Sequence, residues 1–202
     1  MRVVYTGGEG EITEKKSHFI ATVKPVQSEE EAVAFINETK KKYWDARHNC
    51  SAFVIGERQE LTRCSDDGEP AQTAGRPMLD VLLREKITDV AVVVTRYFGG
   101  VLLGTGGLVR AYTEAAKLAL ADAGIHQMQR MKLMDITCSY NDSGKVQYLL
   151  STNEISIENT EYAADVTFHT AVPVSDVSMI EKKITEATAA RAVIDEKDEK
   201  FV

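Results

Sequence analysis

The chain has 202 residues, of which 44% are hydrophobic and 27% are charged, and its formal net charge is −7. These values are ordinary for a globular protein with one large or two small domains. No apolar run approaches the roughly 20 residues of a membrane-spanning helix, and residues 1–16 lack the apolar stretch of a signal peptide. We therefore expect a cytoplasmic protein with no membrane partner.

The charge is unevenly distributed along the chain. Residues 1–130 hold 17 basic and 18 acidic side chains, whereas residues 131–202 hold 7 and 13. An acidic surface repels a phosphate backbone, so the second part is a poor candidate for contact with nucleic acid. The first part is near neutral but has a local basic cluster, Lys40–Lys42 with Arg47. The last turn of a helix favours such cations, which offers a purely structural explanation for this cluster.

The first predicted strand covers residues 17–26, after a polar lead with several glycines. Ser28 followed by three glutamates predicts a capped helix that runs to about residue 43. Two short strands are predicted at 50–55 and 61–65, joined by a polar turn.

An acidic turn at residues 66–70 ends this strand pair, because Asp-Gly and Pro both interrupt regular structure. Pro77 suits the first position of a helix over residues 78–86. The apolar, β-branched run at 90–95 predicts a strand that is covered on both faces. A glycine-rich loop follows, and then a helix from 107 to 122 that Gly124 ends.

A second unit is predicted from residue 131, so that the domains are 1–130 and 131–202. Its order is strand, helix, two strands, helix and strand, which is a ferredoxin-like βαββαβ pattern within an α+β fold. Ser175 is the predicted cap of its second helix, and the acidic tail 195–200 is expected only to keep the chain soluble. The segments are 132–140, 141–152, 155–162, 164–172, 175–190 and 191–194.

The glycine-rich loop is the strongest candidate for a binding surface. Bare amides at the start of a helix, with two arginines nearby, favour anions. A phosphate-binding loop would need lysine where Thr105 stands, and the glycine spacing does not fit a dinucleotide fingerprint. The glycines either permit tight packing or form a surface for phosphate, RNA backbone or an acidic partner. The candidate residues are Arg96, Tyr97, Phe98, Gly99, Gly100, Gly104, Gly106, Gly107 and Arg110.

Arg96 has two interpretations that the sequence leaves open. A guanidinium beside Tyr97 and Phe98 suits phosphate binding and base stacking. Alternatively, Arg96 forms an ion pair with the acidic turn, and both aromatic rings lie in the core.

The acidic turn also has two interpretations, and its residues are Asp66, Asp67, Gly68, Glu69 and Pro70. Clustered carboxylates can bind Mg²⁺ or act as general acid and base, although the spacing does not fit a calcium loop. A local turn that pairs with Arg96 or Arg110 is the alternative. The catalytic hypothesis is a small hydrolase or metal-dependent enzyme that uses Asp66, Asp67, Glu69 and His48.

The segment His48-Asn49-Cys50 invites a zinc or nucleophile interpretation, with Cys64 as a further ligand. Zinc sites use four ligands at recognisable spacing, and the chain has no Cys-x-x-Cys. A spatial Cys–His pair stays open. We assign no catalytic residue and expect no metal or cofactor.

Several motifs together resemble the YigZ/IMPACT family of translation-associated proteins over nearly the whole chain: HNCSAF, DDGEP, AGRP and VVVTRYFGGVLLGTGGLVRAY. The resemblance implies a first domain similar to the RNA-contacting domain IV of elongation factor G and a ferredoxin-like second domain. Eukaryotic members oppose activation of an initiation-factor kinase, through a partner region that the short two-domain form lacks. For this chain, the resemblance therefore implies a non-enzymatic regulatory or binding protein that contacts RNA, the ribosome or a translation factor.

Overall fold

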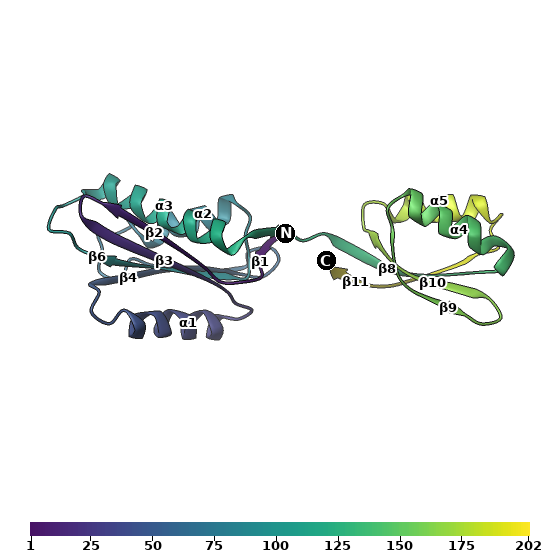
Figure 1. The fold of residues 1–202 in the computed structure, drawn as a ribbon, viewed down its shortest axis with the longest axis horizontal. Helices are drawn as coiled ribbons and strands as arrows, with labels where there is room; N and C mark the ends of the chain where they lie inside the picture. The colour runs from purple at the N-terminus through teal and green to yellow at the C-terminus, as the bar shows by residue number, and fades with distance from the viewer. The chain divides into compact units, whose positions relative to one another are not determined.

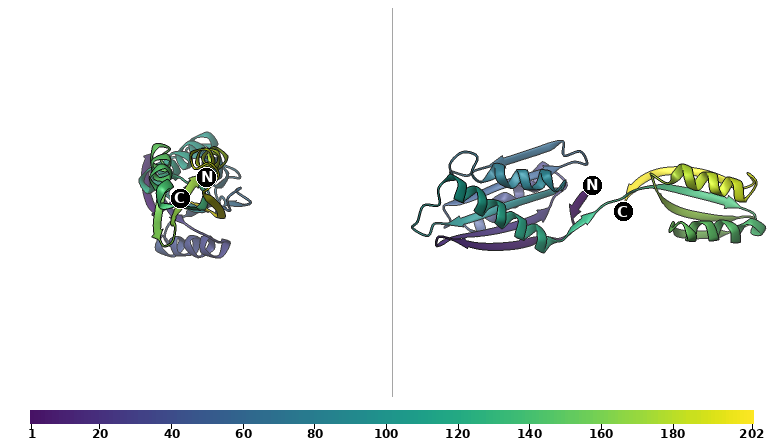
Figure 2. Two further views of the ribbon diagram at one scale, coloured as in Figure 1. Left: turned by 90° about the vertical axis from the view of Figure 1, so that its right-hand side faces the viewer. Right: turned by 90° about the horizontal axis from the view of Figure 1, so that it is seen from above.

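The computed structural model describes residues 1–202, which form two compact units, Met1–Gln127 and Met128–Val202. Figures 1 and 2 show that each unit combines a sheet with helices. The strands of every sheet pair antiparallel, so the fold is α+β. None of the helices has the length and apolar character needed to cross a membrane.

The first unit is built on a five-stranded sheet with helices on both faces (Figure 1). Helix α1 (Glu29–Lys42) covers one face, while α2 (Gly75–Arg84) and α3 (Thr105–Ala123) cover the other. A separate ribbon pairs β1 (Arg2–Val4) with β7 (Ile125–Gln127). The order of the large sheet is β2 (Gly8–Glu14), β3 (Ser17–Pro25), β6 (Val90–Tyr97), β4 (His48–Ile55), β5 (Leu61–Ser65).

The central strand β6 is buried on both faces, as predicted from its continuous apolar run. Val92 and Val94 lie in the core beneath α2 and α3, whereas Ala91 and Val93 belong to the smaller core beneath α1. Alternate side chains of a strand point to opposite faces, so each layer of helices receives its own row. The strand therefore joins the two cores of the unit.

Strand β2 was not expected, because its sequence GEGEITE is polar and contains two glycines. The glycines face α3 at very short range. A Cβ on Gly8 would lie 2.3 Å from the carbonyl oxygen of Ala119, and a Cβ on Gly10 would lie 2.6 Å from the Ala119 amide nitrogen. Only glycine permits this approach of backbone to backbone. Residues 8–14, for which no strand was predicted, therefore form one.

The predicted helices differ from the observed ones mainly at their starts. Ser28 caps α1 as expected, since its Oγ accepts a hydrogen bond from the Glu31 amide at 3.2 Å. Helix α2 begins at Gly75, before Pro77, and α3 begins at Thr105 rather than 107. Gly124 ends α3 with φ 73°, which is the left-handed conformation expected there.

The second unit has the βαββαβ order that the sequence predicted. Its sheet runs in the order β11-β8-β10-β9, and both helices lie on one face (Figure 1). The core beneath them includes Met134, Ile136, Leu150 and Phe168. The elements are β8 (Arg130–Cys138), α4 (Tyr140–Thr152), β9 (Ser156–Tyr162), β10 (Val166–Pro173), α5 (Val177–Ala187) and β11 (Val193–Phe201).

Strand β11 corrects the assignment of the acidic tail. Residues 195–200 continue the strand beside β8, well beyond the predicted end at 194. Opposite charges bridge the strands: Arg130 pairs with Glu199 at 2.5 Å and Lys132 with Glu196 at 3.1 Å. Such cross-strand pairs favour a strand without any apolar pattern.

The predicted cap of the second helix of this unit was also wrong. Helix α5 begins at Val177, and no side chain caps its N-terminus. The Ser175 hydroxyl instead donates to the carboxylate of Asp176.

Asp142 makes the stability of the second unit depend on pH. Its buried carboxylate accepts hydrogen bonds from Arg191 at 2.9 Å and 3.0 Å and from Lys145 at 3.1 Å. Arg191 foremost, and then Lys145, hold the pKa of Asp142 at about 2, below its usual value of 3.8. The stabilisation by this carboxylate is therefore complete above the unfolded pKa and is lost as the pH falls towards 2.

We expect Asp142→Asn to be less stable than the native chain at pH 6, with a difference that shrinks steadily between pH 4 and pH 2. Urea denaturation followed by amide resonances of residues 128–202 measures this difference. Asp198→Asn is the control, because Asp198 is exposed and forms no ion pair. A difference that stays constant with pH would contradict the assignment.

Candidate functional site

The loops at one end of the first unit come together because of the strand register. His18 pairs with Tyr97 and His48 with Arg96, so the starts of β3 and β4 meet the end of β6. Ser65, at the end of β5, pairs with Ser51 and brings the acidic turn to the same end. We call this end the loop rim, made of residues 15–16, 43–47, 66–70 and 98–104.

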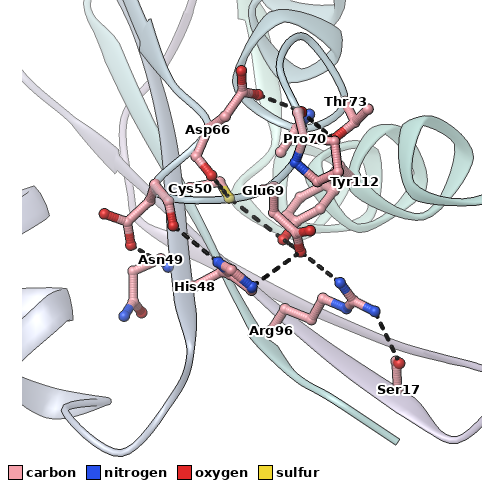
Figure 3. A network of polar contacts seen from close by, with 12 residues as sticks. Ser17, His48, Asn49, Cys50, Asp66, Glu69, Pro70, Thr73, Arg96 and Tyr112 are labelled. Carbon is pink, nitrogen blue, oxygen red and sulfur yellow. Dashed lines mark hydrogen bonds and ion pairs between the residues drawn. The ribbon is translucent and has the colours of Figure 1, made fainter. Parts of the chain in front are cut away.

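Glu69 and Arg96 form a buried ion pair beneath the loop rim (Figure 3). Their side chains are only 3% and 7% exposed, and Arg96 Nη1 lies 2.7 Å from Glu69 Oε1. The Tyr112 hydroxyl donates to the same oxygen at 2.8 Å. The guanidinium also lies over the rings of Phe19 and Phe98, 5.5 Å from each centroid. Arg96 therefore forms the predicted ion pair with the acidic turn and is not a free surface cation. The same interpretation placed both neighbouring rings in the core, which is wrong for Phe98, because its side chain is exposed.

His48 is held in one orientation beside this ion pair. Its Nδ1 lies 2.9 Å from the Asp67 carbonyl oxygen, which can only accept, so Nδ1 donates. In the neutral ring, Nε2 is then left as an acceptor. It lies 4.0 Å from Glu69 Oε1, and the two side chains point towards each other in Figure 3.

The carboxylate of Asp66 is fully engaged by the backbone. It accepts hydrogen bonds from the amides of Gln72 at 2.7 Å, Ala74 at 3.0 Å and Gly75 at 2.8 Å. These bonds fix the start of α2, which explains why the helix begins before Pro77 without a cap from its own N-cap residue.

The carboxylate of Asp67 is engaged as well. It accepts from the Asn49 amide at 2.7 Å and from the Lys40 ammonium at 2.6 Å. Burial raises the pKa of Asp67, but these two hydrogen bonds outweigh burial and hold the pKa below its usual value. Among residues 1–202, no three His, Cys, Asp or Glu side chains are placed to hold a metal ion.

The thiol of Cys50 bonds to the acidic turn, and no hydrogen bond joins it to His48. Its thiol donates to the Asp66 carbonyl oxygen at 3.0 Å, and the Tyr112 hydroxyl is 3.4 Å away. Burial raises the pKa of Cys50 to about 12. A thiol that stays protonated is a poor nucleophile, so this position is structural.

The glycine-rich loop combines tight packing with an open helix start. A Cβ on Gly99 would lie 1.9 Å from the Lys16 carbonyl carbon, and Gly100 and Gly104 have φ of 82° and 74°. No side chain caps α3 at Thr105. The first amides of the helix therefore lack an acceptor within the helix, and they open towards the loop rim.

A pocket of about 420 Å³ lies between the acidic turn and the glycine-rich loop. It thus unites two motifs that are some thirty residues apart in the sequence. Gly68, Glu69, Pro70, Arg96, Phe98 and Gly104 are the predicted site residues in its wall. The wall also contains His48, which the catalytic hypothesis named, and residues that were not predicted as site residues: Arg47, Leu102, Leu103, Thr105 and Leu108.

The other predicted residues lie around the pocket rather than in it. The Tyr97 hydroxyl donates to Asp45 at 2.8 Å and ties β6 to the loop 43–47. Gly107 and Arg110 line a neighbouring groove along α3. Asp66, Asp67, Gly99, Gly100 and Gly106 do not line the pocket.

The surface of the loop rim is apolar and basic at once. Trp44 is 83% exposed and Leu102 82%, and Phe98 and Val101 are also exposed. Sequence reasoning missed Trp44 and Leu102, because a large apolar residue usually indicates core. The exposed cations at this end that form no ion pair are Lys15, Lys16, Lys41, Arg47 and Arg110.

Two family models match the chain. The model described as "Impact N-terminal domain" matches residues 15–120, and "Domain of unknown function (DUF1949)" matches residues 136–191. The chain is 39% identical over 193 residues to "IMPACT family member YvyE" of Bacillus subtilis, covering 96% of this chain and 89% of that protein. It is 36% identical over 174 residues to "IMPACT family member YigZ" of Escherichia coli, covering 85% of each.

A solved structure described as "Crystal structure of an hypothetical protein" is similar over nearly the full length. Its TM-score is 0.60 and its sequence identity is 32%, with 96% of this chain and 95% of that chain covered. The similarity therefore extends through both units.

Proposed function

The chain belongs to the IMPACT family, and from this premise we propose that it is a non-enzymatic regulatory protein of translation that binds RNA through the loop rim. The observation that carries the proposal is the combination of exposed aromatic rings with unpaired cations. Trp44 and Phe98 offer faces on which bases stack, while Lys15, Lys16 and Arg47 offer charge to phosphates.

The open start of α3 supports the same proposal. Amides without a helical acceptor bind phosphate oxygens, and Thr105 stands at the edge of the loop rim. Arg110 is exposed one turn further along α3 and is free to pair with a phosphate. Arg96 acts indirectly in this proposal, because its ion pair with Glu69 holds the acidic turn under the loops.

The family resemblance extends the proposal in two ways. The first unit, taken as residues 1–130, would be similar to the RNA-contacting domain IV of elongation factor G, and the protein would act in the cytoplasm, where ribosomes are. Residues 131–202 hold 13 acidic and 7 basic side chains, so we assign this unit to contact with protein or to positioning of the first.

The occupied carboxylates favour binding over catalysis. Asp66 accepts hydrogen bonds from three amides, and Asp67 accepts from an amide and an ammonium. A hydrolase that used these residues would have to break the bonds that position α2 and β4. We therefore propose no catalytic function for Asp66 and Asp67.

We expect the triple variant Lys15→Asn, Lys16→Asn, Arg47→Ala to bind single-stranded RNA more weakly and with a smaller salt dependence. Each phosphate contact contributes about 0.7 to the slope of log K against log salt, so the slope should fall by about 2. Asn is chosen because Lys15 and Lys16 have φ of 45° and 67°, which Asn tolerates. Fluorescence anisotropy between 50 mM and 300 mM salt measures the slope, and co-sedimentation tests binding to ribosomes.

The matched control removes three exposed, unpaired cations from the opposite end of the same sheet: Arg58→Ala, Arg84→Ala and Lys86→Asn. This control should bind like the native chain. An equal loss of affinity in both triple variants would show that the loop rim is not the RNA surface. No detectable binding to RNA or ribosomes at low salt would refute the proposed function itself.

A further inference from the structure

We infer that the pocket between the acidic turn and the glycine-rich loop binds a guanine base, as part of the RNA that the proposed function requires. The inference rests on that function for its context. The residues of the pocket support the choice of base, because two hydrogen-bond acceptors lie below apolar walls.

The floor of the pocket presents two hydrogen-bond acceptors. Glu69 Oε1 accepts from Arg96 and Tyr112, whereas the other oxygen, Oε2, has no partner within the protein. His48 Nε2 likewise has no hydrogen-bond partner, and in the neutral ring it is an acceptor, because Nδ1 donates to the Asp67 carbonyl oxygen. Both residues line the pocket, and neither atom is both fully buried and unpaired.

Arg96 makes the carboxylate suitable for a neutral ligand. The ion pair balances the charge of Glu69, so the pocket needs donors rather than a cation. Arg96 Nε is buried without any acceptor, which shows that protein groups do not complete this polar network by themselves.

Two acceptors on the facing side chains of Glu69 and His48 favour one of the four RNA bases. Guanine presents two neighbouring donors, N1–H and the N2 amino group, on its Watson–Crick edge. Adenine and cytosine present one donor beside an acceptor, and uracil presents one donor between two acceptors. With any of these three bases, an acceptor of the base would lie opposite an acceptor of the pocket. A buried polar group would then be left unpaired, which is costly.

The walls and the mouth suit the remainder of a nucleotide. Phe98 and Leu102 stand exposed on the glycine-rich loop, with Leu103 and Leu108 below them, and an aromatic face stacks on any base. Thr105 opens α3 at the same wall, where uncapped amides face a phosphate. A volume of about 420 Å³ is within the usual range for small-ligand sites.

The test compares the four 5′-mononucleotides, and single-stranded uridine oligonucleotides that carry one central G or A, on the full chain by calorimetry. We expect the guanine ligands to bind about tenfold more tightly than the adenine ligands. Phe98→Ala and Leu102→Ala should each weaken guanine binding, Phe98→Ala by roughly tenfold. Val101→Ala is the matched control, because Val101 is an exposed apolar residue of the same loop that does not line the pocket.

Glu69→Gln should abolish the preference for guanine, with a thermal melt to verify the fold. If this variant does not fold, the two loop variants still decide the question. Salt-dependent RNA binding with equal affinity for G and A would overturn the inference and leave the proposed function intact. A preference for 5′-GMP without any oligonucleotide binding would support the pocket, assign it to a free nucleotide and refute the RNA function. The absence of all binding would overturn both.

Discussion

Replacing Arg96 by methionine is expected to destabilise the first unit by about 3–5 kcal/mol, which is the usual cost of removing one partner of a buried ion pair. The variant leaves the Glu69 carboxylate 3% exposed and without its counter-ion. It also removes the cation that lies over the rings of Phe19 and Phe98. Urea denaturation followed by circular dichroism measures the loss as a shift of the transition midpoint.

A second change should restore most of this stability. In the double variant Arg96→Met, Glu69→Gln no buried charge is left unpaired, and the Gln carbonyl can still accept from Tyr112. Arg110→Met is the control, because Arg110 is exposed and forms no ion pair. If the double variant were less stable than Arg96→Met alone, the two side chains would contribute separately. It follows that a loss of RNA binding in Arg96→Ala says nothing about contact with RNA unless the fold is verified.

Replacing Gly99 by alanine is the second change with a large expected effect. The added Cβ would lie 1.9 Å from the Lys16 carbonyl carbon and 2.4 Å from the Ser17 amide nitrogen. Both are backbone atoms that cannot rotate away, so the glycine-rich loop must separate from the turn at 15–16. We expect a loss of about 3 kcal/mol, at the upper end of the usual cost of overpacking. Thermal and urea unfolding measure it.

Gly106→Ala is the matched control on the same segment. Its Cβ would meet only the end of the flexible Arg110 side chain at 3.6 Å, so the variant should keep native stability. Native stability in Gly99→Ala would show that the glycine-rich loop can move away from the turn at 15–16 at little cost in free energy. The loop rim would then not be a preformed surface.

The elements that the sequence predicted well are those that bury apolar side chains. Strand β6 has an unbroken apolar run, and α1 has a serine cap with acids in its first turn. The two elements that were missed or cut short have other causes. Strand β2 owes its place to the close approach of α3 to its glycines, and β11 owes its length to charges on the neighbouring strand. Neither cause leaves a mark on local hydrophobicity.

The candidate site was predictable as a set of residues but not as an arrangement. The sequence singled out Glu69 and Arg96, yet which arginine the acidic turn pairs with depends on the register of β4 against β6. The orientation of His48 depends on a carbonyl oxygen nineteen positions away. Trp44 and Leu102 are exposed because no helix or strand covers the loops that carry them. Tertiary pairing decides each of these properties.

The pairing of β1 with β7 has a consequence for the order in which the first unit folds. The chain begins with the strand Arg2–Val4, and its partner Ile125–Gln127 is the last segment of the unit. Gly8 and Gly10 likewise pack on Ala119 and its neighbours. Loops of this span close slowly, because the entropy of closure is lost before the contacts form. Strand β1 and the glycines of β2 thus find their partners only after the last segments of the unit exist, and the unit stays open until almost all of it has been synthesised.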